Sequence, residues 1–352
     1  METPFKAVGK LVDIVNGMAK SRALYTVAQL NVANCIEPNG RMSSDQIAKQ
    51  VHCDPSILYR LMRALSQVGV FRECEDDESG ASHMFEHTEE SIAMRNENFG
   101  NFVLATGLPT VFKTWELFPE VVTKSDLSTG SGNTISNKFF EELEQRQEEA
   151  LVFGKGMTAI TYKIAPLLVA QSDYSQFDTV VDVGGSEGIL LSEILKVNKN
   201  IKLGINFDLP RLIEKFQTSM PERTAQLNAR FKDVSGSFFE SVPTGDCFIL
   251  KSILHDWSDQ CAKDILCTVV RSMKPSSKIY LYEFLVNNEK NEKQSPVVWM
   301  DIRMLNYNDG KERTLKEYQS LATECGLEVE RVVSMEMLPS LIILVKATAT
   351  TS

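Results

Sequence analysis

The sequence lacks any apolar run of about twenty residues, the length that a helix needs to cross a lipid bilayer. Its first residues, METPFK, also lack the pattern of a secretory signal peptide. Together these two absences predict a cytoplasmic protein with no membrane partner.

Closely spaced cysteine pairs are absent too, although the chain contains seven cysteines. Without a CxxC spacing there is no zinc-site pattern, and scattered positions are typical of reduced intracellular thiols rather than of disulfides. We therefore expect neither a disulfide nor a metal. The seven positions are Cys35, Cys53, Cys74, Cys247, Cys261, Cys267 and Cys325.

The chain has no excess of positive charge, since 37 Lys and Arg stand against 47 Asp and Glu for a net charge of −10. Nucleic acids bind basic surfaces, so no nucleic-acid partner is expected. This matters for the N-terminal third, whose order of capped helix, helix and two short strands is typical of a winged helix. The predicted recognition helix offers only Arg60 and Arg63 and lies beside an acidic wing at 73–78, so a packing or dimer module is favoured over DNA binding.

The glycine spacings of two common phosphate-binding loops are missing from residues 179–188, TVVDVGGSEG. The dinucleotide fingerprint requires glycine at its first, third and sixth positions, and counting from Gly184 the last two are Ser186 and Ile189. No Gly-Lys-Ser/Thr follows, so a P-loop is excluded as well.

The same stretch does predict the first half of a nucleotide-binding βαβ unit. A strand over 179–183, with Asp182 near its end, enters a glycine turn and an apolar helix, and a second strand at 204–208 ends in Asp208. A carboxylate at that strand end can accept both hydroxyls of a ribose, and bare glycine backbone admits an amino-acid tail. This combination favours S-adenosylmethionine over a glycine turn that serves only strand-to-helix packing.

A second chemically distinctive stretch is residues 246–259, DCFILKSILHDWSD. A buried strand over 247–250 leads into a turn that contains Lys251, His255 and Trp257. Open α/β sheets bind ligands at the carboxyl ends of their strands, so this turn is expected beside the ligand. His255 is therefore predicted to be catalytic rather than a structural histidine.

Two downstream carboxylates are candidate partners of that histidine. Glu283 ends a predicted strand at 279–283, and Glu312 lies just before a helix capped by Thr314. If both converge on the imidazole, one can fix its tautomer and both can stabilise imidazolium, as general-base catalysis requires.

Residues 99–168 show long helical periodicity with many bulky aromatic side chains. Aromatic side chains that recur along one face of a helix usually pack in the hydrophobic core of a protein. A few, where this segment meets the nucleotide-binding domain, are candidates to wall an aromatic pocket.

Four ordered motifs now resemble one family. They are VDVGGxxG at 181–188, GINFDLP at 204–210, LHDWSD at 254–259 and GKERT at 310–314. The chain is similar over nearly its whole length to the class II S-adenosylmethionine-dependent small-molecule O-methyltransferases, which include caffeic acid, flavonoid and acetylserotonin O-methyltransferases. The resemblance implies an α/β fold, with a Rossmann-like methyltransferase sheet behind an N-terminal, mainly helical winged-helix dimerisation domain.

The resemblance also implies a domain division and a set of roles. The winged-helix dimerisation domain would span 1–110, a helical connector contributing to the acceptor pocket 111–170, and the catalytic domain 171–352. The chain would be a homodimeric methyltransferase that moves a methyl group from S-adenosylmethionine to a phenolic or indolic hydroxyl of a small aromatic acceptor. His255 would be the base with Glu283 and Glu312 as flanking acids. The implied cofactor residues are Gly184, Asp208, Leu209, Ser237, Phe238, Lys251 and Trp257, and the implied acceptor-pocket residues are Phe153, Met157, Met304 and Asn308.

The chain departs from the family at the position facing adenine. Family members usually have Gly-Asp followed by Met or Phe after the third strand, whereas residues 235–239 here are SGSFF. Ser237 can accept a hydrogen bond but carries no charge, and Asp233 lies nearby as a substitute. The segment from Met304 to Glu312 is also one residue shorter than the plant pattern, which bears on the role of Asn308.

Three other functions remain open. A ligand-binding winged-helix regulator would need a basic recognition face, and an inactive relative would be expected to have lost His255 or its acids. Methylation of nitrogen or sulfur, which needs less help from a base, is the main alternative within the transferase class.

Overall fold

The computed structural model describes residues 3–75, 83–95, 99–124, 138–219, 227, 229–287, 296–308, 310–335 and 337–348. It contains two compact units: one combines Met1–Phe112 with Leu143–Ile160, and the other combines Lys113–Glu142 with Thr161–Ser352. The division at 110 and 170 stays a prediction. Residues 125–137 are polar and contain glycine, a pattern that predicts a loop, and they lie outside the described residues.

The first unit is mainly helical, with one small antiparallel sheet of strand order β1-β3-β2. Helix α4 begins with a capping box formed by Ser43 and Gln46, and Asp54 caps α5 just before Pro55. The helices and the strands of this small sheet thus follow, along the chain, the winged-helix order that the sequence predicts. The elements are α1 Thr3–Val15, α2 Gly17–Gln29, α3 Val32–Cys35, β1 Arg41–Ser43, α4 Ser44–Val51, α5 Pro55–Ser66, β2 Phe71–Cys74, β3 Met84–His87, α6 Glu89–Ala93 and α7 Gly100–Thr106.

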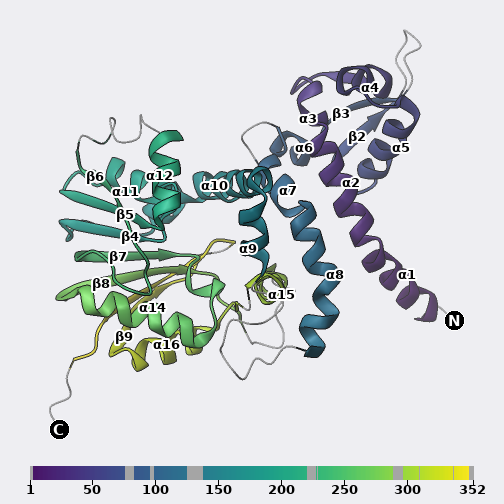
Figure 1. Ribbon diagram of the computed structural model, residues 1–352. Coiled ribbons are helices and arrows are strands. Elements are labelled where there is room, and N and C mark those ends of the chain that lie inside the picture. Colours follow the sequence, from purple (N-terminus) through teal and green to yellow (C-terminus); the bar gives the residue numbers. More distant parts are fainter. Residues whose placement is uncertain are drawn as a thin grey trace. The chain divides into compact units, whose positions relative to one another are not determined.

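The second unit is built around a seven-stranded sheet (Figure 1). Helices α8 Pro109–Lys124 and α10 Gln147–Ala170 belong to both units. The remaining elements are α9 Lys138–Gln145, β4 Thr179–Val183, α11 Ile189–Val197, β5 Leu203–Asp208, α12 Pro210–Ser219, β6 Phe231–Ser235, β7 Gly245–Lys251, η2 Leu254–Asp256, α14 Asp259–Ser272, β8 Met273–Glu283, α15 Pro296–Asn308, α16 Leu315–Glu324, β9 Leu327–Val333 and β10 Ser340–Lys346.

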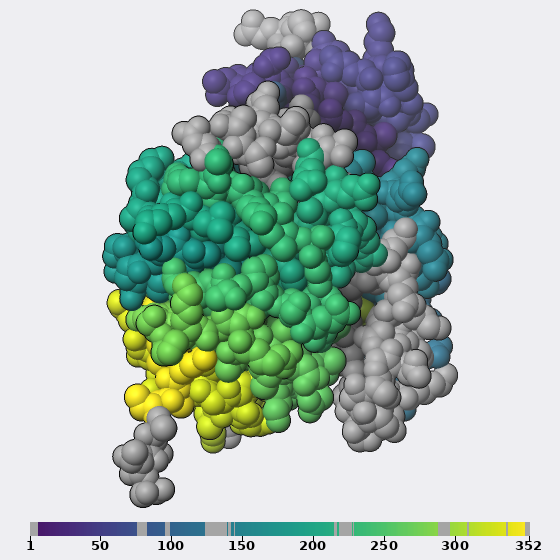
Figure 2. All heavy atoms as spheres, turned by 60° about the vertical axis from the view of Figure 1, so that its left-hand side comes forward, coloured from purple at the N-terminus to yellow at the C-terminus, as the bar shows by residue number. Residues whose placement is uncertain are grey.

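The strand order is β6-β5-β4-β7-β8-β10-β9. Strands β4 to β8 pair in parallel, and β10 pairs antiparallel with both β8 and β9. The chain order therefore reverses between β4 and β7, which is the point where doubly wound sheets bind ligands. Figure 2 shows the surface of this unit passing from teal segments through green segments to yellow segments.

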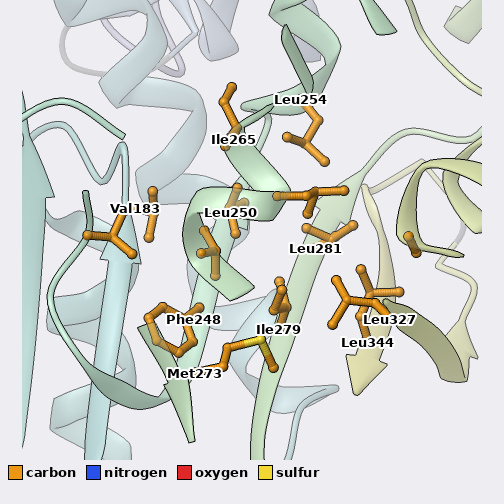
Figure 3. Packing of buried hydrophobic residues seen from close by; sticks show 14 of the residues in the cluster. Val183, Phe248, Leu250, Leu254, Ile265, Met273, Ile279, Leu281, Leu327 and Leu344 are labelled. Atoms are coloured by element: carbon orange, nitrogen blue, oxygen red, sulfur yellow. The ribbon is translucent and has the colours of Figure 1, made fainter. Parts of the chain in front are cut away.

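Both faces of this sheet are buried, which is why its central strands are almost continuously apolar. On one face Val181, Phe248 and Leu250 pack with residues of α14 and α16, and Figure 3 shows Phe248, Leu250, Ile279 and Leu281 in this layer. On the other face alternate strand residues pack with α11 and the end of α10. The strong hydrophobic layers hold the strand ends, and hence the loops beyond them, in fixed positions.

One sequence prediction is wrong. Cys267 in α14 and Cys325 after α16 form a disulfide, with their Cα atoms 5.3 Å apart. The two positions are 58 residues apart, so no short spacing in the sequence reveals the pair. The other five cysteines are free thiols.

Candidate active site

The glycine turn after β4 lies opposite the turn after β7. A Cβ atom on Gly184 would lie 2.5 Å from Cδ1 of Ile253, and one on Gly185 would lie 2.2 Å from Oδ1 of Asn206. Gly184 and Gly188 also adopt positive φ, of 73° and 67°. Close packing alone thus requires glycine here, so the argument for a ligand depends on the polar groups around the turn.

Asp208 is the polar group that the sequence predicts at this edge. Its Oδ2 accepts a hydrogen bond from the Ser186 N–H at 2.8 Å, and its Oδ1 accepts one from the Leu209 N–H at 2.7 Å. Burial raises the pKa of this carboxyl. Each oxygen keeps a further lone pair, so the group can still accept from a ribose diol.

An aromatic group lies at the same edge. The ring of Trp257 is 6.0 Å from that of Phe238 and 4.9 Å from that of Phe239, in edge-to-face arrangements. A Cβ on Gly184 would lie 3.7 Å from Cε1 of Phe238, so these rings border the glycine turn. Flat apolar walls of this kind suit a purine base.

Ser237 and Asp233 are both engaged within the protein. The Ser237 hydroxyl oxygen accepts from the Phe239 N–H at 3.3 Å, inside its own turn. The Asp233 carboxylate accepts from Asn206 Nδ2 at 2.9 Å, and the same amide nitrogen donates to the Ser186 carbonyl at 3.0 Å. Asn206 therefore connects three segments around the glycine turn. The role of Asn206 cannot be predicted from the sequence, because a lone Asn inside a strand forms no recognisable pattern.

A buried charge pair lies beneath the turn. Burial raises the pKa of Asp182 to about 7, although the nearby Lys251 ammonium opposes the rise. Burial lowers the pKa of Lys251, and the carboxylates of Asp182, Glu283 and Asp256 oppose that change. Lys251 and Asp182 thus each favour the charged form of the other.

His255 lies in the three-residue helix η2, directly after that strand. Its Nδ1 is 2.7 Å from Oε1 of Glu312, and its side chain is 11% exposed. In the neutral imidazole, the hydrogen bond to a carboxylate assigns the proton to Nδ1 and leaves Nε2 as the nitrogen that can take a proton. The Nε2 atom is 3.6 Å from Oδ1 of Asp256.

Glu283 supports the same turn from the end of β8. Its Oε1 accepts from the backbone N–H groups of Leu254 at 2.8 Å and Ile253 at 3.2 Å. Burial raises the pKa of Glu283 to about 7, although the positive charge of His255 opposes the rise. The structure thus brings together His255 and the two acids that the sequence predicts, while their chemical roles remain predictions.

These carboxylates control the charge of the imidazole. Burial alone would lower the pKa of His255, but Asp256, Glu312 and Glu283 together raise it to about 10. The surrounding carboxylates therefore favour the protonated imidazole at neutral pH.

The four predicted acceptor-pocket residues fall in different parts of the structure. Met304 is buried in α15, and its carbonyl accepts from the Gly310 N–H at 3.2 Å. Asn308 ends that helix, and its side chain lies outside the described residues. Phe153 and Met157 belong to the part of α10 in the first unit. Their role in a pocket stays a prediction.

The GKERT segment packs against the backbone of the histidine turn. A Cβ on Gly310 would lie 2.3 Å from the His255 carbonyl oxygen, which itself accepts from the Lys311 N–H at 2.8 Å. Arg313 is fully buried and donates to the carbonyls of Leu254 and Trp257. Arg313 is part of the GKERT motif, but nothing in the sequence alone predicts these contacts.

Among the described residues, no group of three or more His, Cys, Asp and Glu side chains could hold a metal ion. None of the helices that the structure describes is long and apolar enough to cross a membrane.

Comparison with known proteins gives consistent results. A model of the O-methyltransferase domain matches residues 124–328, and one of the O-methyltransferase dimerisation domain matches 12–94. O-methyltransferase 9 of Dictyostelium discoideum is 31% identical over 336 residues, which cover 93% of this chain and 90% of that protein. Phenazine O-methyltransferase PhzM of Lysobacter antibioticus is 27% identical over 329 residues, covering 92% of each chain.

Among solved structures, the O-methyltransferase NcsB1 from neocarzinostatin biosynthesis, in complex with S-adenosyl-L-homocysteine and 1,4-dihydroxy-2-naphthoic acid, superposes with a TM-score of 0.71. It is 25% identical, and the match covers 95% of this chain and 98% of that one. On the matched domains and the relatives together, this chain is a methyltransferase that belongs to the O-methyltransferase family.

Proposed function

We propose that this protein transfers the methyl group of S-adenosylmethionine to a hydroxyl of a small aromatic molecule, with His255 as general base. The observation that carries this proposal is the 2.7 Å contact between His255 Nδ1 and Glu312, which leaves Nε2 directed away from its carboxylate partner. The contact supports the role because a general base must be held in one tautomer.

The residues at the glycine turn fit the cofactor. Asp208 offers carboxylate lone pairs for a ribose, and the Phe238 and Trp257 rings offer apolar walls for a base. Bound there, S-adenosylmethionine supplies an electrophilic methyl group on a sulfonium. No metal is needed for this step.

The chemistry at the acceptor then balances as a single displacement. The hydroxyl oxygen forms a bond to the methyl carbon, the carbon–sulfur bond breaks with its electron pair going to sulfur, and the hydroxyl proton passes to Nε2 of His255. The resulting imidazolium is stabilised by the carboxylates of Glu312 and Asp256. A phenol with a pKa near 10 is mostly protonated at neutral pH, so a base contributes roughly 10²–10⁴ in rate.

The acceptor class is supported by the relatives. NcsB1 holds a dihydroxynaphthoic acid, and PhzM is named for a phenazine. We infer a fused or substituted aromatic hydroxyl compound for this chain. We also infer a homodimer, because residues 12–94 match the family's dimerisation domain.

The direct test is His255→Gln, which keeps side-chain polarity but removes the base. We expect turnover on the best of a panel of phenols and hydroxynaphthoates to fall roughly 10²–10⁴-fold, while the Kd for S-adenosylhomocysteine stays unchanged. His52→Gln in the first unit is the matched control. Unchanged turnover in His255→Gln would reject the base assignment, and transfer only to amines or thiols in the same panel would replace O-methylation with the alternative reaction.

A further inference from the structure

Arg313, the residue after Glu312, is fully withdrawn from solvent. A buried guanidinium is costly unless its donors are satisfied, so its partners show what it holds in place. Nη1 donates to the Leu254 carbonyl at 2.7 Å, and Nη2 donates to the Trp257 carbonyl at 2.7 Å.

These two carbonyls lie at the two ends of the turn that contains His255. Leu254 begins helix η2, and Trp257 follows its last residue. The planar fork of the guanidinium thus spans the turn from one side to the other. Its Nη1 also donates to the Lys311 carbonyl at 3.3 Å, which couples the turn to the segment containing Glu312.

Two further contacts fix the arginine itself. Nε donates to Oδ1 of Asp259, the first residue of α14, at 2.8 Å. The Arg313 carbonyl accepts from the Val286 N–H at 3.1 Å, and Leu285 bridges to Arg313 just beyond the end of β8. Arg313 therefore contacts all three segments that carry His255, Glu283 and Glu312.

We propose that Arg313 is a positioning residue for methyl transfer, which holds both ends of the His255 turn and thereby keeps the imidazole against Glu312. This inference rests on the proposed function, in which His255 acts on the acceptor. The arginine acts through the histidine and touches no substrate. A lysine cannot replace it, because an ammonium is a point charge and cannot reach the same four oxygens in the geometry of a fork.

The test is Arg313→Lys, with Arg331→Lys as the control, since Arg331 is an exposed arginine in β9 of the same unit. We expect kcat to fall about 10²-fold, the cost of misplacing a reacting group by about 1 Å, with the Kd for S-adenosylhomocysteine within about twofold. The His255 ring resonances should also shift and titrate at lower pH, because the imidazole loses its contact with Glu312. A merely structural arginine would change the melting temperature but neither readout.

Asp259→Asn provides a second variant, since the Asp259 side chain is 60% exposed and its replacement is compatible with folding. This variant should also lower kcat and make His255 titrate at lower pH, in both cases by less than Arg313→Lys does. Parent-like kcat and titration in Arg313→Lys, or in Asp259→Asn if the lysine variant is insoluble, would overturn the proposal. The His255 titration is measured without turnover, so it tests the positioning role of Arg313 independently of the reaction. Whether His255 is the base is tested separately by His255→Gln.

Discussion

At the scale of single residues, the charge on His255 determines when the site can act. A base must be neutral before it takes a proton, yet the carboxylates of Asp256, Glu312 and Glu283 raise the pKa of His255 to about 10. These carboxylates thus favour the protonated imidazole at pH 7, the form that cannot act as a base. A second positive charge nearby would favour the neutral form and so lower this pKa.

S-adenosylmethionine is therefore predicted to activate His255 as a base when it binds. Its sulfonium should lower the pKa of His255 by roughly 1 to 3 units, the usual effect of a neighbouring charge, whereas S-adenosylhomocysteine, which has the same shape without the charge, should lower it much less. Turnover should rise with pH until the imidazole of the bound complex is neutral and then level off. The measurement is an NMR titration of the histidine rings with each compound.

The chain has only four histidines, so its spectrum contains few histidine ring resonances. The resonance that is absent from the spectrum of His255→Gln is that of His255. Equal titration of His255 with the two compounds would contradict the prediction.

The residue scale also shows what a sequence can predict about such a site. The proximity of His255, Glu283 and Glu312 could be predicted because each follows a strand or precedes a capped helix, and parallel strands end at one edge. Arg313 and Asn206 could not, because their roles depend on backbone carbonyls and side chains that only the folded turns bring near. Ser237 stays a predicted cofactor residue, and its hydrogen bond from the Phe239 N–H could not be predicted from the sequence.

At the scale of elements, the strands were predictable because burial on both faces makes them continuously apolar. The sequence predicts strands at 179–183 and 204–208, and the structure has β4 at Thr179–Val183 and β5 at Leu203–Asp208. The pairing of α14 with α16 was not predictable, since it depends on which helices share one face of the sheet. The disulfide between Cys267 and Cys325 lies at that pairing.

The disulfide leads to a prediction about stability. It joins positions separated by 58 residues, and in the chain-entropy model closing a loop of that length stabilises the folded state by about 4 kcal/mol. Cys267→Ser should therefore lower the free energy of unfolding by about that amount in urea titrations. The control is Cys261→Ser, which removes a free thiol from the same helix.

Reductant should lower the stability of the parent to that of Cys267→Ser and leave the variant unchanged. Titration of seven thiols in the unreduced, denatured parent would show that the bond does not form.

At the scale of the whole molecule, the first helix, α1, exposes several apolar side chains to solvent. In α1, Leu11 is 63% exposed and Val15 is 74% exposed, and Val8, Val12 and Ile14 are exposed beside them. Contiguous apolar surface of this kind marks an interaction site. Because α1 overlaps the matched dimerisation domain at 12–94, we infer that a second copy of the chain covers it.

The predicted consequence is that a charged pair on this helix separates the dimer. The parent should show twice the chain mass of 39.5 kDa by light scattering, and the double variant Leu11→Glu, Val15→Glu should show the single mass, because two buried carboxylates per copy cannot be desolvated without partners. Val197→Glu changes an equally exposed valine in α11 and should leave the dimer intact. A double variant that remains dimeric would place the interface elsewhere. If the monomer still binds S-adenosylhomocysteine but loses turnover, each copy needs its partner to complete the acceptor site and not the cofactor site.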